Sequence, residues 1–333
     1  MKKSNLVAGA VMIYSPLASG NGAYILHSQL SRYIDNYHVC AVPAKLTVFP
    51  PLLARYVKNA RLVHTVPEYG DVFLQAAEKS VVTFHNYFWD EAYFNYCQPL
   101  RRLFYKYVQK AYVKRALIQA DVITTVSDFT ANLISSAFPG VSVKTIYNGV
   151  DVDKFKPIQS KEGRKIKVLF SGNTSRRKGG HILSAIADSL PGGVMLQVTG
   201  GPSVNSAHIN HPNIEFLGAV HHDSMPNLYN QADMLLLPSY REGLSLSVLE
   251  AMASGLPVIG YDSSSMSELI VAEKGGILCQ AGDVSALNVA IRELAGDPLK
   301  RYEMGQFNRA RTERQFNQAR MVAGYRTIFD CLQ

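Results

Sequence analysis

The stretch that decides the fold lies at residues 234–260 and reads MLLLPSYREGLSLSVLEAMASGLPVIG. Its first five residues, 234–238, are a short apolar run of the kind that forms a buried strand. A polar loop follows, and over residues 247–254 the apolar side chains recur at helical spacing. Gly255 suits the position after a helix C-terminus, and Pro257 cannot continue a helix. The stretch therefore predicts a strand, a loop at its carboxyl end, and a helix that begins at that loop.

Short apolar runs alternate with helical patterns along the whole chain, which predicts α/β units around mostly parallel sheets. Strands are expected at residues 6–14, 38–42, 61–66, 80–85, 121–126 and 143–147, and again at 166–170, 194–199, 214–217, 234–238, 257–261 and 276–279. Helices are expected at 23–34, 100–119, 127–137, 180–189, 224–231, 247–254 and 285–295, with a helical tail over 298–332.

The chain has 333 residues, more than one hydrophobic core usually fills, so two domains are expected. Residues 151–165 are polar and read as a linker between them. We predict two doubly wound α/β domains, residues 1–155 and 156–310, and a C-terminal helix at 311–333 that packs back on the first domain. In such sheets ligands bind outside the carboxyl ends of the strands.

Composition narrows the class of protein. Hydrophobic residues make up 47% and charged residues 18%, as in ordinary soluble globular proteins. The apolar stretch at residues 6–14 is too short to span a bilayer, and the four cysteines show no C-x-x-C spacing. A cytoplasmic location is therefore expected. The net charge of +8 suggests an anionic partner, but no recognisable nucleic-acid-binding module accompanies it.

Two glutamates flank the start of the predicted helix, and each has an ordinary explanation. Glu250 stands three residues after Ser247, which matches a capping box. Glu242 could be a solvated loop charge paired with Arg241. The alternative is a ligand site, because free amides and the helix dipole at a helix N-terminus attract anions.

The stretch from Glu242 onwards closely resembles the E-x7-E region of the retaining glycosyltransferases of family four. That family has the GT-B fold, two Rossmann-like domains that face each other across a cleft, and it uses nucleotide-sugar donors. The resemblance implies that Glu242 approaches the donor sugar and that Glu250 binds the ribose, since charged acceptors bind hydroxyls strongly. It also implies donor contacts from four of the seven residues between them, Gly243, Leu244, Ser245 and Leu246. Leu244 and Ser245 replace the family's usual Phe-Gly, and this difference concerns the identity of the donor sugar more than the fold.

A second motif, SGNTSRRKGG at residues 171–180, resembles the family's G-R-x-x-x-x-K-G segment. The family's arginine and lysine neutralise the donor diphosphate, which implies that role for Lys178 and a catalytic contribution from it. Asn173 stands where the arginine is usual, so Arg176 or Arg177 could supply the charge; we take Arg177 and Asn173 as donor-binding candidates. Taken alone, the segment could equally be an exposed basic turn.

Two features of the first half also match the family. His85 ends an apolar strand, where a histidine is more often structural, but the family carries a histidine there, close to the transferred sugar. Binding and orientation of the sugar are therefore its implied catalytic role. Gly20 and Gly22 resemble the first glycine-rich loop, where backbone can approach the donor phosphate or the acceptor, although two glycines can also form a simple turn.

The resemblance further implies that the donor, a UDP- or GDP-sugar, binds the second domain and that the acceptor, a glycan or a lipid-linked molecule, binds the first. The implied pathway is cell-surface polysaccharide synthesis, such as lipopolysaccharide. Neither a metal nor another cofactor is expected, because Lys and Arg can neutralise the diphosphate. A nucleotide-sugar-binding or epimerising protein of the same fold is the alternative.

The segment from Leu100 to Ala120 interleaves six basic residues with aromatic and aliphatic ones. Such a helix can lie on an anionic membrane surface, where each basic residue contributes about 1 kcal/mol. The alternative is a helix that packs on the core and keeps a solvated basic face. The first interpretation predicts a peripheral association with the inner face of the membrane.

Overall fold

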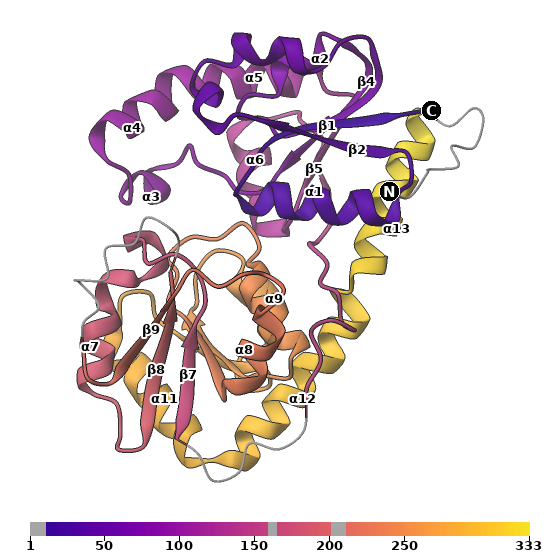
Figure 1. Cartoon of the computed structure of the whole chain (residues 1–333). Coiled ribbons are helices and arrows are strands. Elements are labelled where there is room, and N and C mark those ends of the chain that lie inside the picture. The colour runs from indigo at the N-terminus through magenta and orange to yellow at the C-terminus, as the bar shows by residue number, and fades with distance from the viewer. Residues whose placement is uncertain (1–10, 159–164, 201–210) are drawn as a thin grey trace. The chain divides into compact units, whose positions relative to one another are not determined.

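The computed structural model describes residues 11–158, 165–200 and 211–333 (Figure 1). These residues form two compact units, one of residues up to Asn148 together with Ala319–Gln333, the other of Gly149–Gln318. Each unit contains one six-stranded sheet, and all the strand pairs are parallel. The predicted α/β class with two Rossmann-like, doubly wound sheets is therefore confirmed. The predicted domain boundaries lie at 155/156 and 310/311. In the structure the chain passes from the first unit to the second at 148/149 and returns to the first at 318/319.

The sheet of the first unit has the strand order β2-β1-β3-β4-β5-β6. Its strands are β1 (Ile13–Ala18), β2 (Tyr37–Val42), β3 (Ala60–Thr65), β4 (Ala77–Phe84), β5 (Val122–Thr125) and β6 (Lys144–Thr145). The order changes direction between β1 and β3, so the loops that follow these two strands flank the place where doubly wound sheets usually bind ligands.

Helices cover both faces of this sheet. On one face lie α1 (Gly22–Tyr33) and α13 (Gln318–Leu332), and on the other α2 (Asp71–Leu74) and α5 (Lys110–Gln119), as Figure 1 shows. The remaining helical segments are η1 (Ala44–Val48), η2 (Pro50–Tyr56), α3 (Glu91–Phe94), α4 (Pro99–Leu103), η3 (Phe104–Gln109) and α6 (Asp128–Ala137). Ser127 caps α6, as its position in the sequence suggests.

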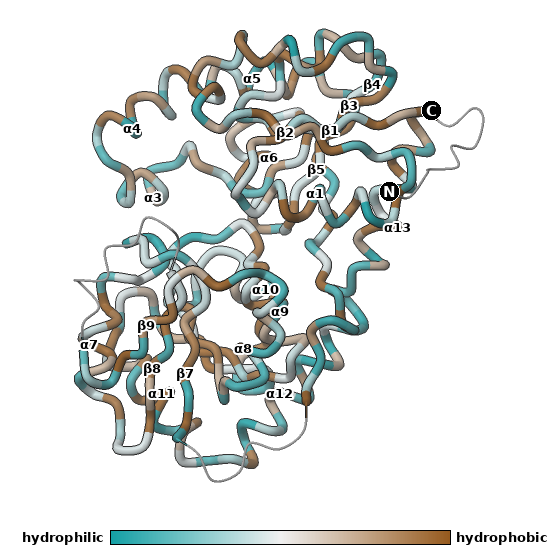
Figure 2. The backbone as a smooth tube through the Cα atoms, in the orientation of Figure 1, coloured by the Kyte–Doolittle hydropathy of each residue, from teal (hydrophilic) through white to brown (hydrophobic). Residues whose placement is uncertain are grey.

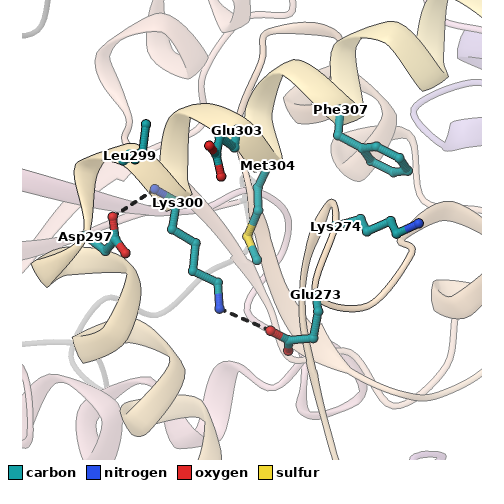
Figure 3. A pocket seen from close by; sticks show the side chains of 8 residues that line it. All are labelled: Glu273, Lys274, Asp297, Leu299, Lys300, Glu303, Met304 and Phe307. Carbon is teal, nitrogen blue, oxygen red and sulfur yellow. Dashed lines mark hydrogen bonds and ion pairs between the residues drawn. The ribbon is translucent and has the colours of Figure 1, made fainter.

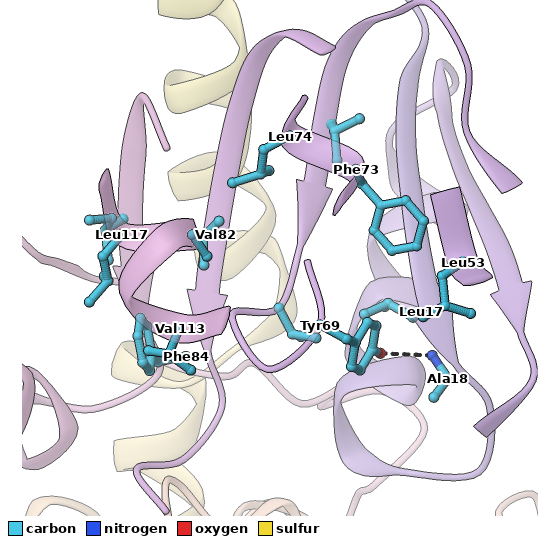
Figure 4. Packing of buried hydrophobic residues seen from close by; sticks show 14 of the residues in the cluster. Leu17, Ala18, Leu53, Tyr69, Phe73, Leu74, Val82, Phe84, Val113 and Leu117 are labelled. Carbon is cyan, nitrogen blue, oxygen red and sulfur yellow. Dashed lines mark hydrogen bonds between the residues drawn. The ribbon is translucent and has the colours of Figure 1, made fainter. Parts of the chain in front are cut away.

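The core under α2 and α5 contains Leu17, Phe73 and Val113, and it extends to the carboxyl edge of the sheet (Figure 4). There the hydroxyl of Tyr69 accepts a hydrogen bond of 2.8 Å from the amide of Ala18. This bond holds the loop after β3 against the end of β1.

Three expectations for the first unit need correction. The first strand runs from Ile13 to Ala18 instead of 6–14, of which 6–10 lie outside the described residues; the Ser-Pro pair at 15–16 looked like its end but pairs with β2. β6 has only two residues. The helix expected at 100–119 contains the π-helical stretch η3 between α4 and α5, which hydropathy spacing does not reveal.

The sheet of the second unit has the strand order β12-β11-β10-β7-β8-β9. Its strands are β7 (Ile166–Phe170), β8 (Val194–Thr199), β9 (Ile214–Gly218), β10 (Met234–Leu237), β11 (Val258–Tyr261) and β12 (Gly276–Cys279). They agree with the expected strands to within one residue at either end. Figure 2 shows β7 and β8 as mainly hydrophobic, as expected for strands covered on both faces.

The helical segments of the second unit are η4 (Arg176–Lys178), η5 (Gly180–Ile182), α7 (Leu183–Asp188), α8 (Met225–Gln231), α9 (Leu246–Ala253), α10 (Met266–Leu269), α11 (Val284–Gly296) and α12 (Pro298–Gln315). Asp283 and Asp297 cap α11 and α12 with their side chains. The expected helical tail is broken at Phe316 and Asn317, where Asn317 bridges to Val150. Beyond this break, α13 supplies Met321, Tyr325 and Phe329 to the core of the first unit.

Candidate functional site

Two loops of the second unit meet because β7 and β10 are neighbours in the sheet. Val168 pairs with Met234 and Leu169 with Leu235, although more than sixty residues separate the two strands in the chain. The strand order changes direction between these two strands, so the loops that follow them flank the ligand-binding position of a doubly wound sheet. These loops carry the two motifs singled out in the sequence.

Glu242 lies at the centre of this meeting point. Its Oε1 accepts hydrogen bonds from Arg177 Nη1 at 3.0 Å and from Ser239 Oγ at 2.8 Å, and Lys178 Nζ lies 3.5 Å away. The residue is only 8% exposed. The view of Glu242 as a solvated charge paired with Arg241 is therefore wrong, because its partners come from the basic loop after β7.

The charges around Glu242 keep it ionised. Burial by itself raises the pKa of this carboxyl, but Lys178 and Arg177 outweigh burial and lower the pKa below its usual value. Two cations thus face one carboxylate, and the cluster retains a positive charge. Such a cluster at the edge of a sheet can receive an anion.

The conformation of the basic loop depends on its glycines. Gly179 has φ +82°, and a Cβ at Gly180 would lie 2.0 Å from the carbonyl oxygen of Thr174. The loop is also tied to its neighbour, since the amide of Tyr240 donates to the carbonyl of Arg177 at 2.9 Å. The Lys-Gly-Gly sequence therefore places two cations next to the loop after β10.

The structure also shows which residue can take the place of the family's arginine, since this sequence has Asn173 at that position. Asn173 is exposed and accepts a hydrogen bond from the amide of Ser175, so it shapes the turn. Arg176 is exposed as well, whereas Arg177 points to Glu242 and to the carbonyl of Arg241. Of the two arginines that could supply the charge, Arg177 is the one that the structure brings to the cluster.

The helix N-terminus next to Glu242 is capped by Ser245. Its Oγ accepts from the amide of Val248, and α9 begins at Leu246. The capping box between Ser247 and Glu250 is therefore wrong, because Ser247 lies inside the helix. Gly243, Leu244 and Ser245 are buried, and Leu246 is half-buried, between the glutamate cluster and the first turn of α9.

Glu250 faces a separate set of partners from the segment around α8. Tyr229 donates its hydroxyl to Oε2 at 2.9 Å, and His222 Nε2 lies 3.1 Å from Oε1. Burial and the neighbouring Glu250 raise the pKa of Tyr229, so it stays protonated and donates. Lys154 lies behind His222, with its Nζ 3.2 Å from Nδ1. None of these three residues was expected from the sequence, since no motif singles them out.

The other predicted site residues belong to the first unit. His85 directly follows β4 and is half-buried, with its Nε2 3.1 Å from Nε2 of His27; burial lowers the pKa of His85 to about 4. Gly20 is exposed in the loop between β1 and α1, and Gly22 is exposed as the first residue of α1. Gly20 has φ +86°, and Asn21 between them caps α1.

A pocket of about 460 Å³ lies elsewhere in the second unit, along α12 (Figure 3). Its central cation, Lys300, is already paired with Glu273 and Glu293. None of the predicted site residues lines it. Within residues 11–158, 165–200 and 211–333, no group of three or more acidic, cysteine or histidine side chains is arranged to hold a metal ion.

Comparison with known protein families accounts for both halves of the chain. A family model described as Glycosyltransferase Family 4 matches residues 12–154, and one described as Glycosyl transferases group 1 matches residues 151–311. Together the two matches include both loops of the site, His85 and both glycines of the first loop.

Individual relatives are more distant. Spore coat protein SA of Bacillus subtilis is 28% identical over 242 residues, which cover 62% of this chain and 64% of that protein. N-acetyl-alpha-D-glucosaminyl L-malate synthase of Bacillus anthracis is 28% identical over 237 residues, covering 65% and 61%. The chain thus spans less than two thirds of the length of these curated relatives.

Solved structures share the fold. Sucrose-phosphate synthase from Thermosynechococcus elongatus has a TM-score of 0.84 at 19% identity and covers 97% of this chain and 99% of its own. HepE from Anabaena, in complex with UDP and glucose, has a TM-score of 0.80 at 17% identity and covers 96% and 100%. At these identities the likeness concerns the fold alone.

Proposed function

The chain belongs to the family-four glycosyltransferases of the GT-B type, and on this basis we propose that it transfers a hexose-type sugar from a UDP- or GDP-sugar to a glycan or lipid-linked acceptor with retention of anomeric configuration. The observation that carries the proposal is the contact of Arg177 and Lys178 with Glu242. It joins the two motifs of the family at the point where a doubly wound sheet binds its ligand.

The donor diphosphate is assigned to the cationic side of this cluster. Arg177 and Lys178 carry two positive charges against the single carboxylate of Glu242, and the N-terminus of α9 lies next in the chain. A diphosphate there completes the charge balance and is stabilised by the helix dipole. The same cations stabilise the charge that develops on the leaving diphosphate when the glycosidic bond breaks.

The two glutamates are assigned to hydroxyl groups. The contacts of the Glu242 carboxylate with described residues all fall on Oε1, which leaves Oε2 for the hydroxyls of the donor sugar. Glu250 is held by Tyr229 and His222 and uses one bond per oxygen. A carboxylate offers about four lone pairs, so Glu250 retains acceptors for the two ribose hydroxyls.

The chemical step proposed here needs no nucleophile from the protein. The bond between the anomeric carbon and the phosphate oxygen breaks, the acceptor oxygen bonds to the same face of that carbon, and the acceptor proton passes to the departing phosphate oxygen. Arg177 and Lys178 supply the neutralising charge, which is why we propose a metal-independent reaction. His85 is proposed to bind and orient the transferred sugar.

A thermal-shift panel of UDP-, GDP- and ADP-sugars tests the donor site. One donor is expected to stabilise the wild type selectively, and Glu250→Ala is expected to lose that stabilisation. The matched control is Glu303→Ala, which removes an exposed glutamate of the same unit from α12. If no donor stabilises the wild type, or if Glu250→Ala responds like the control, the assignment fails.

Product analysis separates transfer from the alternative, a protein that binds or epimerises a nucleotide sugar. Release of the nucleoside diphosphate that rises when acceptor glycans are added supports transfer. A changed sugar that remains attached to the nucleotide would support epimerisation. NMR of the anomeric proton of the product also reports whether the configuration is retained.

We further propose that the segment from Leu100 to Ala120 binds an anionic membrane surface. Leu100, Leu103, Tyr107 and Ile118 are exposed, at 82%, 54%, 65% and 84%. Four of the six basic residues, namely Arg101, Lys106, Lys110 and Lys114, form no ion pair with described residues, whereas Arg102 and Arg115 pair with Glu91 and Asp71. Such a combination of apolar and cationic side chains suits a phospholipid interface.

Vesicle co-sedimentation tests this surface. No helix in the described part of the chain combines the length and apolar character needed to cross a bilayer. Vesicles that contain phosphatidylserine are expected to bind the wild type, and Lys106→Glu with Lys110→Glu to weaken binding at least tenfold, since each basic residue contributes about 1 kcal/mol. Lys144→Glu with Lys274→Glu makes the same change in net charge at two exposed positions elsewhere and serves as the control. Equal loss in both double variants would contradict a specific surface.

A further inference from the structure

A chain of buried polar side chains crosses the sheet of the first unit beneath α1 and α13. It contains Ser15, His27, Tyr37, His64, Thr83, Thr124 and Tyr325, drawn from five of the strands and from these two helices. All seven side chains have hydrogen-bond partners. Polar groups in an otherwise apolar layer cost stability unless they are satisfied, and an apolar set could fill the same space. We therefore looked for a function of these buried polar side chains.

One end of this chain reaches His85. His27 Nε2 lies 3.1 Å from His85 Nε2, and His27 Nδ1 lies 2.7 Å from the hydroxyl of Tyr37. The same hydroxyl lies 2.7 Å from Nδ1 of His64. The rings of His27 and His64 are stacked, with centroids 4.1 Å apart, so both are held rigidly.

The other end passes through three hydroxyl groups. His64 Nε2 lies 2.7 Å from Thr83 Oγ1, which in turn lies 2.6 Å from Thr124 Oγ1. Tyr325 of α13 lies 3.4 Å from the same Thr83 oxygen. Hydroxyl groups can donate or accept, so this end accommodates either proton arrangement.

All three histidines are neutral at physiological pH. Burial lowers the pKa of His27 and of His64 well below the usual value, and neighbouring histidines lower them further. Each imidazole therefore carries a single N–H and a single lone pair. Burial raises the pKa of Tyr37, so its hydroxyl keeps its proton.

Counting protons leaves two arrangements. When Tyr37 donates to His27 Nδ1, His27 carries its proton on Nε2 and donates it to His85, whose own proton then lies on Nδ1. When Tyr37 donates to His64, His27 donates from Nδ1, its Nε2 accepts from His85, and His85 Nδ1 is an acceptor. A mixed state would bring two lone pairs together at 2.7 Å, and Ser15, 2.8 Å from His27 Nδ1, can adapt to either arrangement.

We propose that His27 is a positioning residue that holds the ring of His85 and couples its tautomer to the hydroxyl of Tyr37. His85 Nδ1 is then a donor or an acceptor toward a sugar oxygen according to the direction of one buried hydroxyl. The inference rests on the proposed function for the identity of the ligand, a sugar hydroxyl, but the coupling itself does not depend on it.

Nitrogen-15 NMR of the imidazole rings tests the coupling directly, because the protonated and unprotonated nitrogens of a neutral ring give well-separated signals. The chain has nine histidines, and His85→Gln identifies the signals of His85. In the wild type the proton of His85 is expected on Nδ1 to the same extent that the proton of His27 lies on Nε2, because the two arrangements link these positions. His27→Phe replaces the imidazole by an aromatic ring without nitrogens, and the ratio of His85 tautomers is expected to change. His27→Gln retains a hydrogen-bonding group near the position of Nε2 and is expected to return the ratio toward the wild-type value.

Two further variants keep the test decisive. Tyr37→Phe removes the shared hydroxyl at the centre of the chain and is expected to uncouple His85 in the same way. His38→Phe replaces an exposed histidine of β2 and is expected to leave the His85 signals unchanged. Should His85 keep its wild-type ratio of tautomers in both His27→Phe and Tyr37→Phe, the buried polar side chains would be a packing feature and the inference would be overturned.

Addition of a donor separates this inference from the proposed function. A UDP- or GDP-sugar that shifts the His85 signals supports both. For His27→Phe, kcat for the donor is then expected to fall about fivefold with little change in KM, because the hydrogen bond that orients His85 is lost. If the tautomers of His85 change in the variants but its signals do not shift with any nucleotide sugar, the coupling is confirmed and the sugar-binding role of His85 is contradicted.

Discussion

Glu242→Gln is the most informative single substitution in the donor site. It keeps the shape of the side chain and an oxygen for Ser239, but it removes the charge that Arg177 and Lys178 face. The variant should therefore lose stability in the unliganded protein, because two partly buried cations are left without their carboxylate.

The magnitude follows from the contacts. The bond from Arg177 is 3.0 Å long, and the two side chains are 19% and 10% exposed, so solvent screens the pair weakly. A hydrogen bond between charged groups contributes about 1.5–3 kcal/mol. Lys178 at 3.5 Å adds a smaller amount, so the expected loss is about 2 kcal/mol, or roughly 4–8 °C in the melting temperature of a unit of this size.

Two optical probes can locate the loss. Far-UV circular dichroism follows both units, whereas fluorescence follows Trp89, the single tryptophan, which is buried in the first unit. The dichroism transition is expected to move to lower temperature. Because the folded pKa of Glu242 lies below the ordinary value of 4.5, its contribution is present above pH 4.5 and disappears as the pH falls through the folded pKa. The gap between variant and wild type should therefore close in acid.

Ligand binding provides the decisive contrast. The nucleoside diphosphate alone is expected to bind Glu242→Gln at least as tightly as the wild type, because the site has become more positive. The additional affinity of the intact nucleotide sugar should be lost with the sugar contact. A variant as stable as wild type at pH 7, or one that loses affinity for the diphosphate alone, would refute the reasoning; Glu303→Gln is the matched control.

Three other substitutions probe separate parts of the second unit. Gly180→Ala should destabilise it by more than about 2 kcal/mol in a urea titration, because the new Cβ would lie 2.0 Å from a backbone oxygen, whereas Gly192→Ala, with open space around its Cβ, should be neutral. Ser245→Ala removes the cap of α9 and should cost about 1 kcal/mol in the same titration. Tyr229→Phe removes the donor to Glu250 and should weaken nucleotide binding about fivefold by calorimetry, while unchanged affinity would argue against a ribose role for that glutamate.

Much of the fold could be predicted from local patterns. The strands of the second unit were located to within a residue or so, because a strand buried on both faces is a short apolar run between polar loops. The first strand was misplaced because Ser15 and Pro16 look like a loop, yet they pair with β2. The π-helical stretch at Phe104–Gln109 was missed because hydrophobic spacing does not encode a change of helical pitch.

The sequence by itself determined the class of fold, the two loops of the donor site and the family, because short apolar runs and contiguous motifs are local properties of the chain. Tertiary structure alone decided how those parts combine. Arg177, and not Arg176, contacts Glu242. Glu250 is bonded to His222 and Tyr229 and does not form a capping box. His27 contacts His85 and is linked through Tyr37 to His64. The physical reason is that parallel strands distant in the chain become neighbours in a sheet, so partners separated by tens of residues meet only after the strand order is set.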